Sequence, residues 1–403
     1  MREMKDSGVE WIGEIPREWE KAKLKHFVKI NSGEMISKEE YVDNGAFPII
    51  GSNGEIGRTN KYNNEEKVIT TGRVGTIGTI HIVKKSWITD NALIVKSNNI
   101  NQKYLSYIIV NFDFKHMLSG TAQPLITSTN LKNQYITLPP LDEQQKISTY
   151  LDTKCTKIDS IIEKQEKVIE KLKEYKLSVI TEAVTKGLNP DVKMKDSGVE
   201  WIGEIPEHWS FQKLKYATQI MRGKFNHRPR NDPDYYDGEY PFVQTGDVAR
   251  ALKFIDSYSQ TLNGLGYSVS KEFPKGSICM TIAANVGDVA VLNFNACFPD
   301  SVVGFVPTSK TYWNYLYYTL SAMKQQLTRN AIISTQLNLN IEIIKEEYIP
   351  IAPLQEQHQI ADYLDKKCSA IDKSIEQKQA IIEKLKEYKK SLIYEVVTGK
   401  REV

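Results

Sequence analysis

The sequence predicts an α+β protein built as a tandem repeat, in which two mixed α/β globules alternate with two long helices. Two observations support this prediction. The segment MKDSGVEWIGEIP, which begins at Met4, recurs unchanged from Met194. The segment PLDEQQKISTYLDTKC, which begins at Pro140, is matched by PLQEQHQIADYLDKKC from Pro353. We therefore expect two copies related by an approximate twofold axis, with their long helices paired as an antiparallel coiled coil.

The repeat also sets the domain boundaries. We predict a first globule at residues 1–140, a helix at 141–190, a second globule at 191–353 and a second helix at 354–403. The stretch between the opening and closing segments is longer in the second copy than in the first. Constant ends around a variable middle are expected when two similar frames present two different surfaces. A series of many short repeats, as in a solenoid, is not found.

The region after each closing segment has the periodicity of a coiled coil. Apolar residues alternate at spacings of three and four, which is the pattern of a heptad repeat. The same phase extends back to the prolines, so each helix is expected to run for about 40–45 residues, or roughly 60–68 Å. The face opposite the apolar stripe is charged, so each helix needs a partner helix along its stripe. The other copy of the repeat supplies that partner. The predicted seam consists of Ile158, Ile161, Gln165, Val168, Leu172, Tyr175 and Val179, and of Ile371, Ser374, Lys378, Ile381, Leu385, Tyr388 and Leu392.

An alternative for these helices is that each packs separately on its own globule. In the coiled-coil interpretation, Ile162 and Ile169 widen the apolar stripe, and the polar positions Gln165 and Lys378 fix the register. Gly187 and Pro190 end the first helix before the second copy begins.

The two middles, residues 17–139 and 207–352, predict mixed α/β structure. Each contains β-rich runs punctuated by Gly, Asn and Pro, for example Lys67–Val83 and Gly276–Phe294. Shorter helical stretches follow, at Lys103–Leu118 and Tyr312–Leu327.

Composition narrows the class of protein. The net charge of +3 is spread thinly over the chain, so no segment is basic enough to indicate nucleic-acid binding by itself. The four cysteines have no paired spacing, which favours structural roles in a reducing compartment. No apolar run approaches the roughly 18 residues that a membrane span needs, and no signal peptide is evident. We therefore expect a cytoplasmic protein without a membrane partner.

Motifs that could carry catalysis are weak. Gly72, Gly75 and Gly78 lie in a run of β-branched residues and predict a hairpin turn rather than a nucleotide-binding loop. The stretch NDPDYY from Asn231 resembles the motif with which amino-methyltransferases hold the target nitrogen. However, Asp234 stands in the place of the second proline and no cofactor-binding glycine motif precedes it. We interpret it as a polar loop.

Nuclease and metal sites are also not predicted. Pro190-Asp191 and Pro299-Asp300 lack the Glu-x-Lys pair that would complete a magnesium-dependent nuclease site. The six histidines show neither metal-ligand spacing nor a neighbouring nucleophile. The sequence therefore predicts no catalytic residue, no metal site and no cofactor in this chain.

Polar and basic side chains gather in turns of both middles. Arg, Lys, Asn and Gln are the side chains that pair with base edges or phosphate, although solvated loops have a similar composition. The candidate DNA-binding residues of the first middle are Ser52, Asn53, Arg58, Lys61, Arg73, Lys84 and Lys85. Those of the second are Arg222, Lys224, Asn226, His227, Arg228, Arg230, Gln244 and Arg250.

The whole chain resembles the specificity subunit of a type I restriction-modification system. The resemblance rests on WIGEIPxxW at the start of each copy, on PL.EQ..I..YLD.K before each long helix, and on a turn containing Gln123 or Gln336 upstream of Pro140 or Pro353 at the same distance. It implies that each globule is a target recognition domain that reads one half of a split double-stranded DNA sequence. It also implies that the helices set the distance between the two halves.

The resemblance further implies partners that carry the chemistry. Two modification subunits would bind S-adenosylmethionine and methylate adenine N6, and two restriction subunits, which use ATP and Mg²⁺, are optional further partners. Two alternatives from other classes remain: a protein–protein scaffold that does not contact DNA, and a self-sufficient DNA methyltransferase or nuclease.

Overall fold

The computed structural model describes residues 2–118, 125–332 and 339–403, with the backbone only for residues 330–332. The chain forms two compact units, which we describe separately. Unit 1 contains Met1–Gln165 and Ala380–Val403, and unit 2 contains Glu166–Gln379. Each unit therefore combines one globule with a segment of both long helices, α3 (Leu141–Lys186, 46 residues) and α10 (Leu354–Val397, 44 residues).

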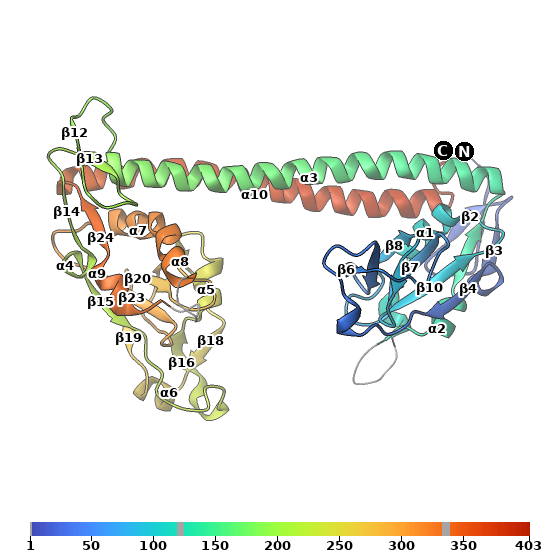
Figure 1. Cartoon of the computed structure of the whole chain (residues 1–403), viewed down its shortest axis with the longest axis horizontal. Helices are drawn as coiled ribbons and strands as arrows, with labels where there is room; N and C mark the ends of the chain where they lie inside the picture. The colour runs from blue at the N-terminus through green and yellow to red at the C-terminus, as the bar shows by residue number, and fades with distance from the viewer. Residues whose placement is uncertain (1, 119–124, 333–338) are drawn as a thin grey trace. The chain divides into compact units, whose positions relative to one another are not determined.

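Unit 1 is built on a four-stranded antiparallel sheet in the order β4-β10-β7-β8 (Figure 1). A three-stranded sheet, β6-β5-β9, and two strand pairs, β1-β2 and β11-β3, complete it. The strands are β1 (Met4–Asp6), β2 (Glu14–Pro16), β3 (Glu20–Lys23), β4 (Val28–Ser32), β5 (Phe47–Gly51), β6 (Gly54–Thr59), β7 (Val68–Gly72), β8 (Ile80–Val83), β9 (Trp87–Ile88), β10 (Ala92–Ser97) and β11 (Tyr135–Leu138). The helices are η1 (Leu24–His26), η2 (Lys38–Glu40), α1 (Gln102–Val110), η3 (Phe114–Met117) and α2 (Ser128–Lys132).

Unit 2 repeats this frame with a five-stranded sheet in the order β15-β23-β20-β21-β17 and a four-stranded sheet in the order β18-β16-β22-β19. The strands are β12 (Met194–Asp196), β13 (Glu204–Pro206), β14 (Ser210–Lys213), β15 (Thr218–Arg222), β16 (Tyr236–Phe242), β17 (Phe254–Ile255), β18 (Gln260–Leu262), β19 (Glu272–Phe273), β20 (Ile278–Thr281), β21 (Val289–Leu292), β22 (Ala296–Cys297), β23 (Val302–Pro307) and β24 (Tyr348–Ile351). The helices are α4 (Leu214–Ala217), η4 (Pro233–Tyr235), α5 (Thr245–Arg250), α6 (Gly264–Ser268), α7 (Trp313–Ala322), α8 (Lys324–Ile332) and α9 (Ile341–Glu346).

Most of the additional length of the second copy lies in one part of its globule. Gly33 contacts the backbone at Ile88, and Gly223 makes the equivalent contact with the backbone at Phe298. The interval between glycine and contact is longer in the second copy, and the extra residues belong to the stretch that forms α5, β17, β18 and α6. The added residues thus lie in the predicted variable middle, and the middle itself contains a backbone frame that both copies share.

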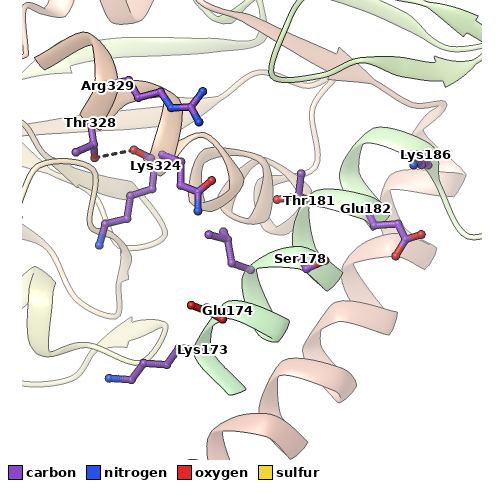
Figure 2. Close-up of a pocket in the computed structure, with 11 residues that line it drawn as sticks. Lys173, Glu174, Ser178, Thr181, Glu182, Lys186, Lys324, Thr328 and Arg329 are labelled. Carbon is purple, nitrogen blue, oxygen red and sulfur yellow. Dashed lines mark hydrogen bonds between the residues drawn. The ribbon is translucent and has the colours of Figure 1, made fainter. Parts of the chain in front are cut away.

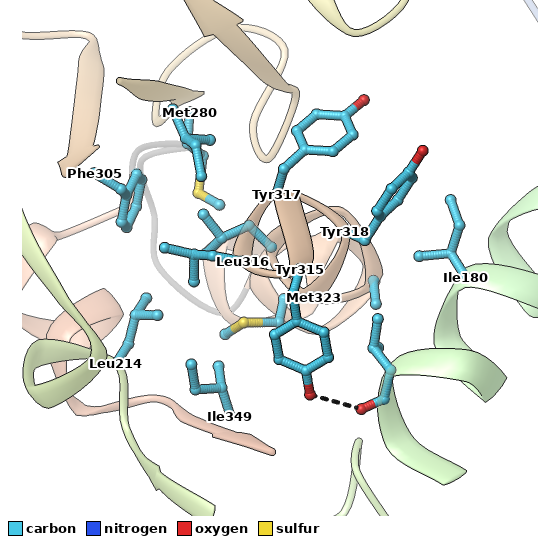
Figure 3. Packing of buried hydrophobic residues seen from close by; sticks show 14 of the residues in the cluster. Ile180, Leu214, Met280, Phe305, Tyr315, Leu316, Tyr317, Tyr318, Met323 and Ile349 are labelled. Atoms are coloured by element: carbon cyan, nitrogen blue, oxygen red, sulfur yellow. Dashed lines mark hydrogen bonds between the residues drawn. The ribbon is translucent and has the colours of Figure 1, made fainter. Parts of the chain in front are cut away.

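In the core of each unit, a buried tyrosine contacts the C-terminal end of a long helix. Tyr315, on α7, is fully buried and donates its hydroxyl to the carbonyl oxygen of Val184, 3.2 Å away, near the end of α3 (Figure 3). In unit 1, the hydroxyl of the equivalent Tyr104 lies 3.4 Å from the carbonyl oxygen of Val397, at the end of α10. Each globule is therefore closed by the C-terminal end of the helix that belongs to the other copy of the repeat.

Within each unit, segments of α3 and α10 pack antiparallel, which confirms the predicted pairing (Figure 1). In unit 2 the ammonium group of Lys176 lies 2.7 Å from both carboxylate oxygens of Asp372. In unit 1 Lys389 makes the same contact with Asp159, also at 2.7 Å. The two lysines, like the two aspartates, are separated along the chain by the same interval as the two closing segments. The two ion pairs therefore occupy equivalent positions of the repeat.

The predicted seam needs a correction of its phase. Ile158 and Val179 are buried, as are Ile371 and Leu392. The predicted members Gln165, Leu172, Ser374, Lys378 and Leu385 are half-buried. Other predicted seam residues are exposed, namely Ile161 (43%), Val168 (38%), Tyr175 (53%), Ile381 (44%) and Tyr388 (49%).

The interior positions are taken by the neighbours of these exposed residues. They are Ile162, Ile169 and Lys176 on α3 and Ile375, Ile382 and Lys389 on α10. A heptad repeat can place its interior residues at alternating spacings of three and four or of four and three, counted from Ile158 or Ile371. The prediction used the first order, and the structure has the second, in which each interior lysine pairs with an aspartate.

Several other sequence predictions can be compared with the structure. Gly72, Gly75 and Gly78 form the turn of the β7–β8 hairpin, as predicted, and Gly75 and Gly78 have positive φ. All four cysteines are buried and unpaired. Gln123 and Gln336 lie outside the described residues. Among the described helices, none is both long and apolar enough to span a membrane.

Candidate nucleic-acid interface

Four predicted basic residues of unit 2, Arg222, Lys224, Arg228 and Arg230, gather at one corner of its sheet, which we define as residues 222–224 and 298–302. The amide of Gly223 donates to the carbonyl of Val302 (2.9 Å), and the amide of Lys224 donates to that of Phe298 (3.0 Å). A Cβ at Gly223 would collide with the carbonyl oxygens of Phe298 and Pro299. Phe298 is fully buried and stacks on Phe273. The corner is therefore a rigid support for the side chains it carries.

Three arginines converge on Asp300 at this corner. Arg222 donates its Nε to the carbonyl oxygen of Asp300 (2.6 Å), Arg230 pairs with the Asp300 carboxylate, and Arg228 Nη2 lies 3.7 Å from it. Arg228 also donates to the carbonyl oxygens of Phe225 (2.8 Å) and His227 (2.7 Å). Three guanidinium groups thus contact one acidic residue, two of them at its carboxylate and one at its backbone carbonyl, which leaves an excess of positive charge. Such an excess is what a phosphate-binding surface needs.

The loop that carries these arginines is anchored by aromatic packing. Phe225 is buried against Tyr235, Tyr236 and Phe242. The ring of His227 stacks on Tyr235 at 3.8 Å, and its Nε2 lies 2.8 Å from Asp232. The predicted polar loop NDPDYY is therefore only partly polar, because its tyrosines pack inward.

Unit 1 has the same corner with different side chains, at residues 32–34 and 88–92. The amide of Gly33 donates to the carbonyl of Ala92 (3.1 Å), and that of Glu34 to the carbonyl of Ile88 (2.9 Å). Ser32 stands where unit 2 has Arg222. The one predicted arginine here, Arg73, follows β7 and donates its Nη1 to the hydroxyl of Ser32 (3.2 Å). A guanidinium group thus reaches the same corner from a different strand.

Two further predicted positions flank these corners. In unit 1 the Ser52–Asn53 turn packs on the β7–β8 hairpin, because Thr79 donates its hydroxyl to the carbonyl of Ser52. In unit 2 Gln244 directly follows Val243, whose amide donates to the carbonyl of Cys297 (2.9 Å) next to the corner. The side-chain amide of Gln244 donates to that of Gln260 (2.9 Å).

Other predicted residues lie away from the corners or are engaged within the globule. Arg58 holds the carbonyl of Gly45 (2.7 Å), and Lys61 pairs with Glu40 (2.6 Å). Arg58 and Lys61 lie towards the start of β5, and Lys84 and Lys85 precede the start of the parallel strand β9, at the end opposite Ser52. In unit 2, Arg250 pairs with the buried Asp247, and the backbone amide of Asn226 donates to Val269 (3.2 Å). The structure therefore divides the candidates of unit 1 into two groups.

A basic groove in unit 2 was not predicted from the sequence. It is a cavity of about 1060 Å³ between α8 and the second half of α3 (Figure 2). Four basic side chains line it, Lys173, Lys186, Lys324 and Arg329, together with two acidic ones, Glu174 and Glu182. Lys324 also pairs with Asp288 in the turn between β20 and β21. The groove is thus a second place in unit 2 where basic side chains outnumber acidic ones.

Sequence reasoning considered Asp300 only as part of a nuclease motif, which it rejected, and did not connect this residue with the arginines. Its partners are 70 to 78 residues away in sequence, so no local pattern shows the cluster. Within the described parts of the chain, no group of three His, Cys, Asp or Glu residues could hold a metal ion.

Comparison with known proteins agrees with this architecture. Residues 16–171 and 206–387 match the family described as the type I restriction modification DNA specificity domain. Among relatives, a putative type I restriction enzyme MjaX specificity subunit from Methanocaldococcus jannaschii is 28% identical over 96% of this chain and 95% of its own. The MjaVIII specificity subunit from the same organism is 24% identical over 96% and 93%.

A solved structure is similar over the whole fold. It concerns complex assembly and conformational transition of the type I R-M system, and one of its chains matches with a TM-score of 0.69, 16% identity and coverage of 96% of this chain and 99% of that one. Since the family matches both copies of the repeat, the chain belongs to the DNA specificity subunits of type I restriction-modification systems.

Proposed function

We propose that this chain is the non-catalytic subunit that reads a bipartite, asymmetric DNA target, with one half-site for each unit. The observation that carries the proposal is the pair of corners, which share one backbone frame but differ in side chains. Unit 1 offers Ser32 and Arg73, whereas unit 2 offers Arg222, Arg228 and Arg230. Direct readout depends on the side chains that face the base edges, so two different corners favour two different half-sites.

The exposed apolar residues of the long helices support the docking of partner subunits. Val168 and Tyr175 on α3, and Ile381 and Tyr388 on α10, have heptad spacing and are 38–53% exposed. An apolar stripe at heptad spacing is the surface on which a further helix packs. We assign these two equivalent stripes to two modification subunits, which would bind S-adenosylmethionine and methylate adenine. ATP and Mg²⁺ would be used by restriction subunits, if these join.

Docking through the stripe can be tested by substitution. Replacing Val168 and Tyr175 together by Glu puts charge on the stripe without touching the buried seam, and should weaken capture of the cognate modification subunit at least tenfold (~1.4 kcal/mol). The matched control is Lys171→Glu with Lys164→Glu, on exposed polar positions of the same helix. Equal capture by both double variants, measured by titration with the purified modification subunit, would place the docking surface elsewhere.

The continuous helices also support a role as a ruler for the unread spacer. Inserting one heptad after Gln165 and one after Gln379 keeps the phase of the seam and lengthens each helix by about 10.5 Å. At about 3.4 Å per base pair, the spacer of the methylated sequence should grow by roughly three base pairs. An unchanged spacer in a stable, active complex would rule out the ruler.

The function as a whole is tested by expressing the chain with its cognate modification subunit in a host free of DNA methylation. Modified adenines are then mapped by long-read sequencing. We expect one split motif with two unlike halves. A stable complex without methylation would favour a scaffold that does not contact DNA, and S-adenosylmethionine binding by the isolated chain would favour a self-sufficient methyltransferase.

A further inference from the structure

Arg222 differs from the other arginines of the corner in how its guanidinium group is held. It is the last residue of β15, and Gly223, which follows it, is packed tightly against the Phe298–Pro299 backbone. Its Nε donates to the carbonyl oxygen of Asp300 at 2.6 Å. The guanidinium group is therefore tethered at two points, by a strand end and by a backbone carbonyl.

The terminal nitrogens of Arg222 remain available. Among the described residues, neither has a hydrogen-bond or ion-pair partner, and the side chain is exposed. Arg228 instead uses one terminal nitrogen for two carbonyl oxygens, and Arg230 pairs with the Asp300 carboxylate. Arg222 thus presents the two terminal donors of a tethered guanidinium group, next to arginines that are themselves held in place.

A fixed pair of donors matches the edge of one base in particular. Guanine offers O6 and N7 as two acceptors in the major groove, and a bidentate arginine is the commonest specific contact to it. Phosphate also accepts two hydrogen bonds. Lys224, Arg228 and Arg230 already place positive charge for phosphate around the corner, and a contact that only adds charge needs no fixed orientation.

The repeat provides a second reason to regard this position as one that reads sequence. The glycine and the carbonyl segment of the corner are kept in unit 1, yet the residue equivalent to Arg222 is Ser32. A residue that only supports the backbone frame would be the same in both copies of the repeat. A residue that reads a base differs between the copies when their half-sites differ.

We infer that Arg222 reads a guanine in the half-site recognised by unit 2, and that the backbone carbonyl of Asp300 holds its guanidinium group in position. The inference rests on the proposed DNA-recognition function and specifies a G·C pair in that half-site. Arg222→Lys keeps the positive charge but removes the two parallel guanidinium donors, so it separates base reading from phosphate binding.

The test maps methylated adenines produced by the assembled complex with wild-type chain, Arg222→Lys and Lys224→Gln. For Arg222→Lys we expect one G·C position in one half-site to become degenerate, with its preference over the other bases reduced roughly 5- to 150-fold. The other half-site should stay unchanged, which shows that the variant is folded and assembled. Lys224→Gln should lower methylation at all sites with the motif intact, because a phosphate contact carries no sequence information.

Asp300→Asn serves as a control, because it keeps the backbone carbonyl that holds Arg222 and removes only the carboxylate charge that Arg228 and Arg230 contact; it should leave the G·C position as sharp as in the wild type. The inference is overturned if Arg222→Lys leaves every position of the motif as sharp as in the wild type, or if neither half-site contains a G·C pair. Failure of the proposed function would look different, since the wild-type complex itself would then give no split motif.

Discussion

Hydroxyl groups hold the C-terminal end of a long helix in each unit, two of them in unit 1 and one in unit 2. In unit 1 the carbonyl of Val397 also accepts from Thr137 Oγ1, at 2.6 Å. In unit 2 the residue equivalent to Thr137 is Pro350, which has no hydroxyl, so among the described residues Tyr315 is the side chain that bonds to Val184. The hydroxyl of Tyr315 is shared with the carbonyl oxygen of Pro350, 3.0 Å away. Burial raises the pKa of both Tyr104 and Tyr315, so both hydroxyls stay protonated donors.

This difference predicts unequal effects of one substitution. Tyr315→Phe leaves the buried carbonyl of Val184 without its side-chain donor and should lower the free energy of unfolding by about 1–2 kcal/mol. Tyr104→Phe should cost about half as much, because Thr137 remains bonded to Val397. Urea titrations of the two variants would show this order as a shift in the unfolding midpoint of each. A larger loss for Tyr104→Phe would contradict it.

The contact between Asp365 and the unit 2 globule predicts a dependence on pH. Burial raises the pKa of this carboxyl, but hydrogen bonds from Lys253, Tyr318 and Asn314 outweigh it, and the pKa lies below the ordinary 3.8. A depressed pKa contributes stability above the unfolded value, and that contribution is lost as the pH falls through the folded value. The stability difference between wild type and Asp365→Asn should therefore be largest near neutral pH and shrink below about pH 4. A difference that stays constant from neutral pH to below the ordinary pKa would show that the charge of Asp365 is not involved.

Among the elements, the paired long helices show best what sequence alone could predict. Their existence, starts and lengths followed from the heptads and from the duplicated segments. The phase of the seam did not, because Tyr175 is apolar and Lys176 is charged, and apolarity favoured Tyr175 for the interior. Lys176 is inside because Asp372, far away in the sequence, meets it there. Such a compensating partner cannot be read from the local pattern.

The two lysine–aspartate pairs offer an internal comparison at this scale. The side chains of Lys176 and Asp372 are 21% and 23% exposed, whereas those of Lys389 and Asp159 are 30% and 55% exposed. Solvent screens the second pair more. In double-mutant cycles with Lys→Met and Asp→Asn, we expect a coupling energy of about 1 kcal/mol for Lys176–Asp372 and below about 0.5 kcal/mol for Lys389–Asp159. Equal couplings would mean that burial does not control these pairs.

At the scale of the whole molecule, duplication explains why the frame was predictable and the reading surface was not. Segments that occur twice revealed the tandem α+β architecture directly. The candidate contacts lie where the copies differ, so composition could suggest Arg222 and Arg230 but not that Asp300 gathers them. For the same reason, Lys84 and Lys85 were grouped with Ser52 by closeness in sequence, although the strands carry them to the other end of the sheet.

The central claim is that each globule reads its own half-site on a common frame. The most direct measurement replaces residues 207–352 by a second copy of residues 17–139, assembles the chain with the modification subunit and maps the methylated adenines. We predict a symmetric motif in which the half-site of unit 1 appears twice, in inverted orientation. An unchanged asymmetric motif from this chain would contradict the account, because sequence would then be read outside the globules.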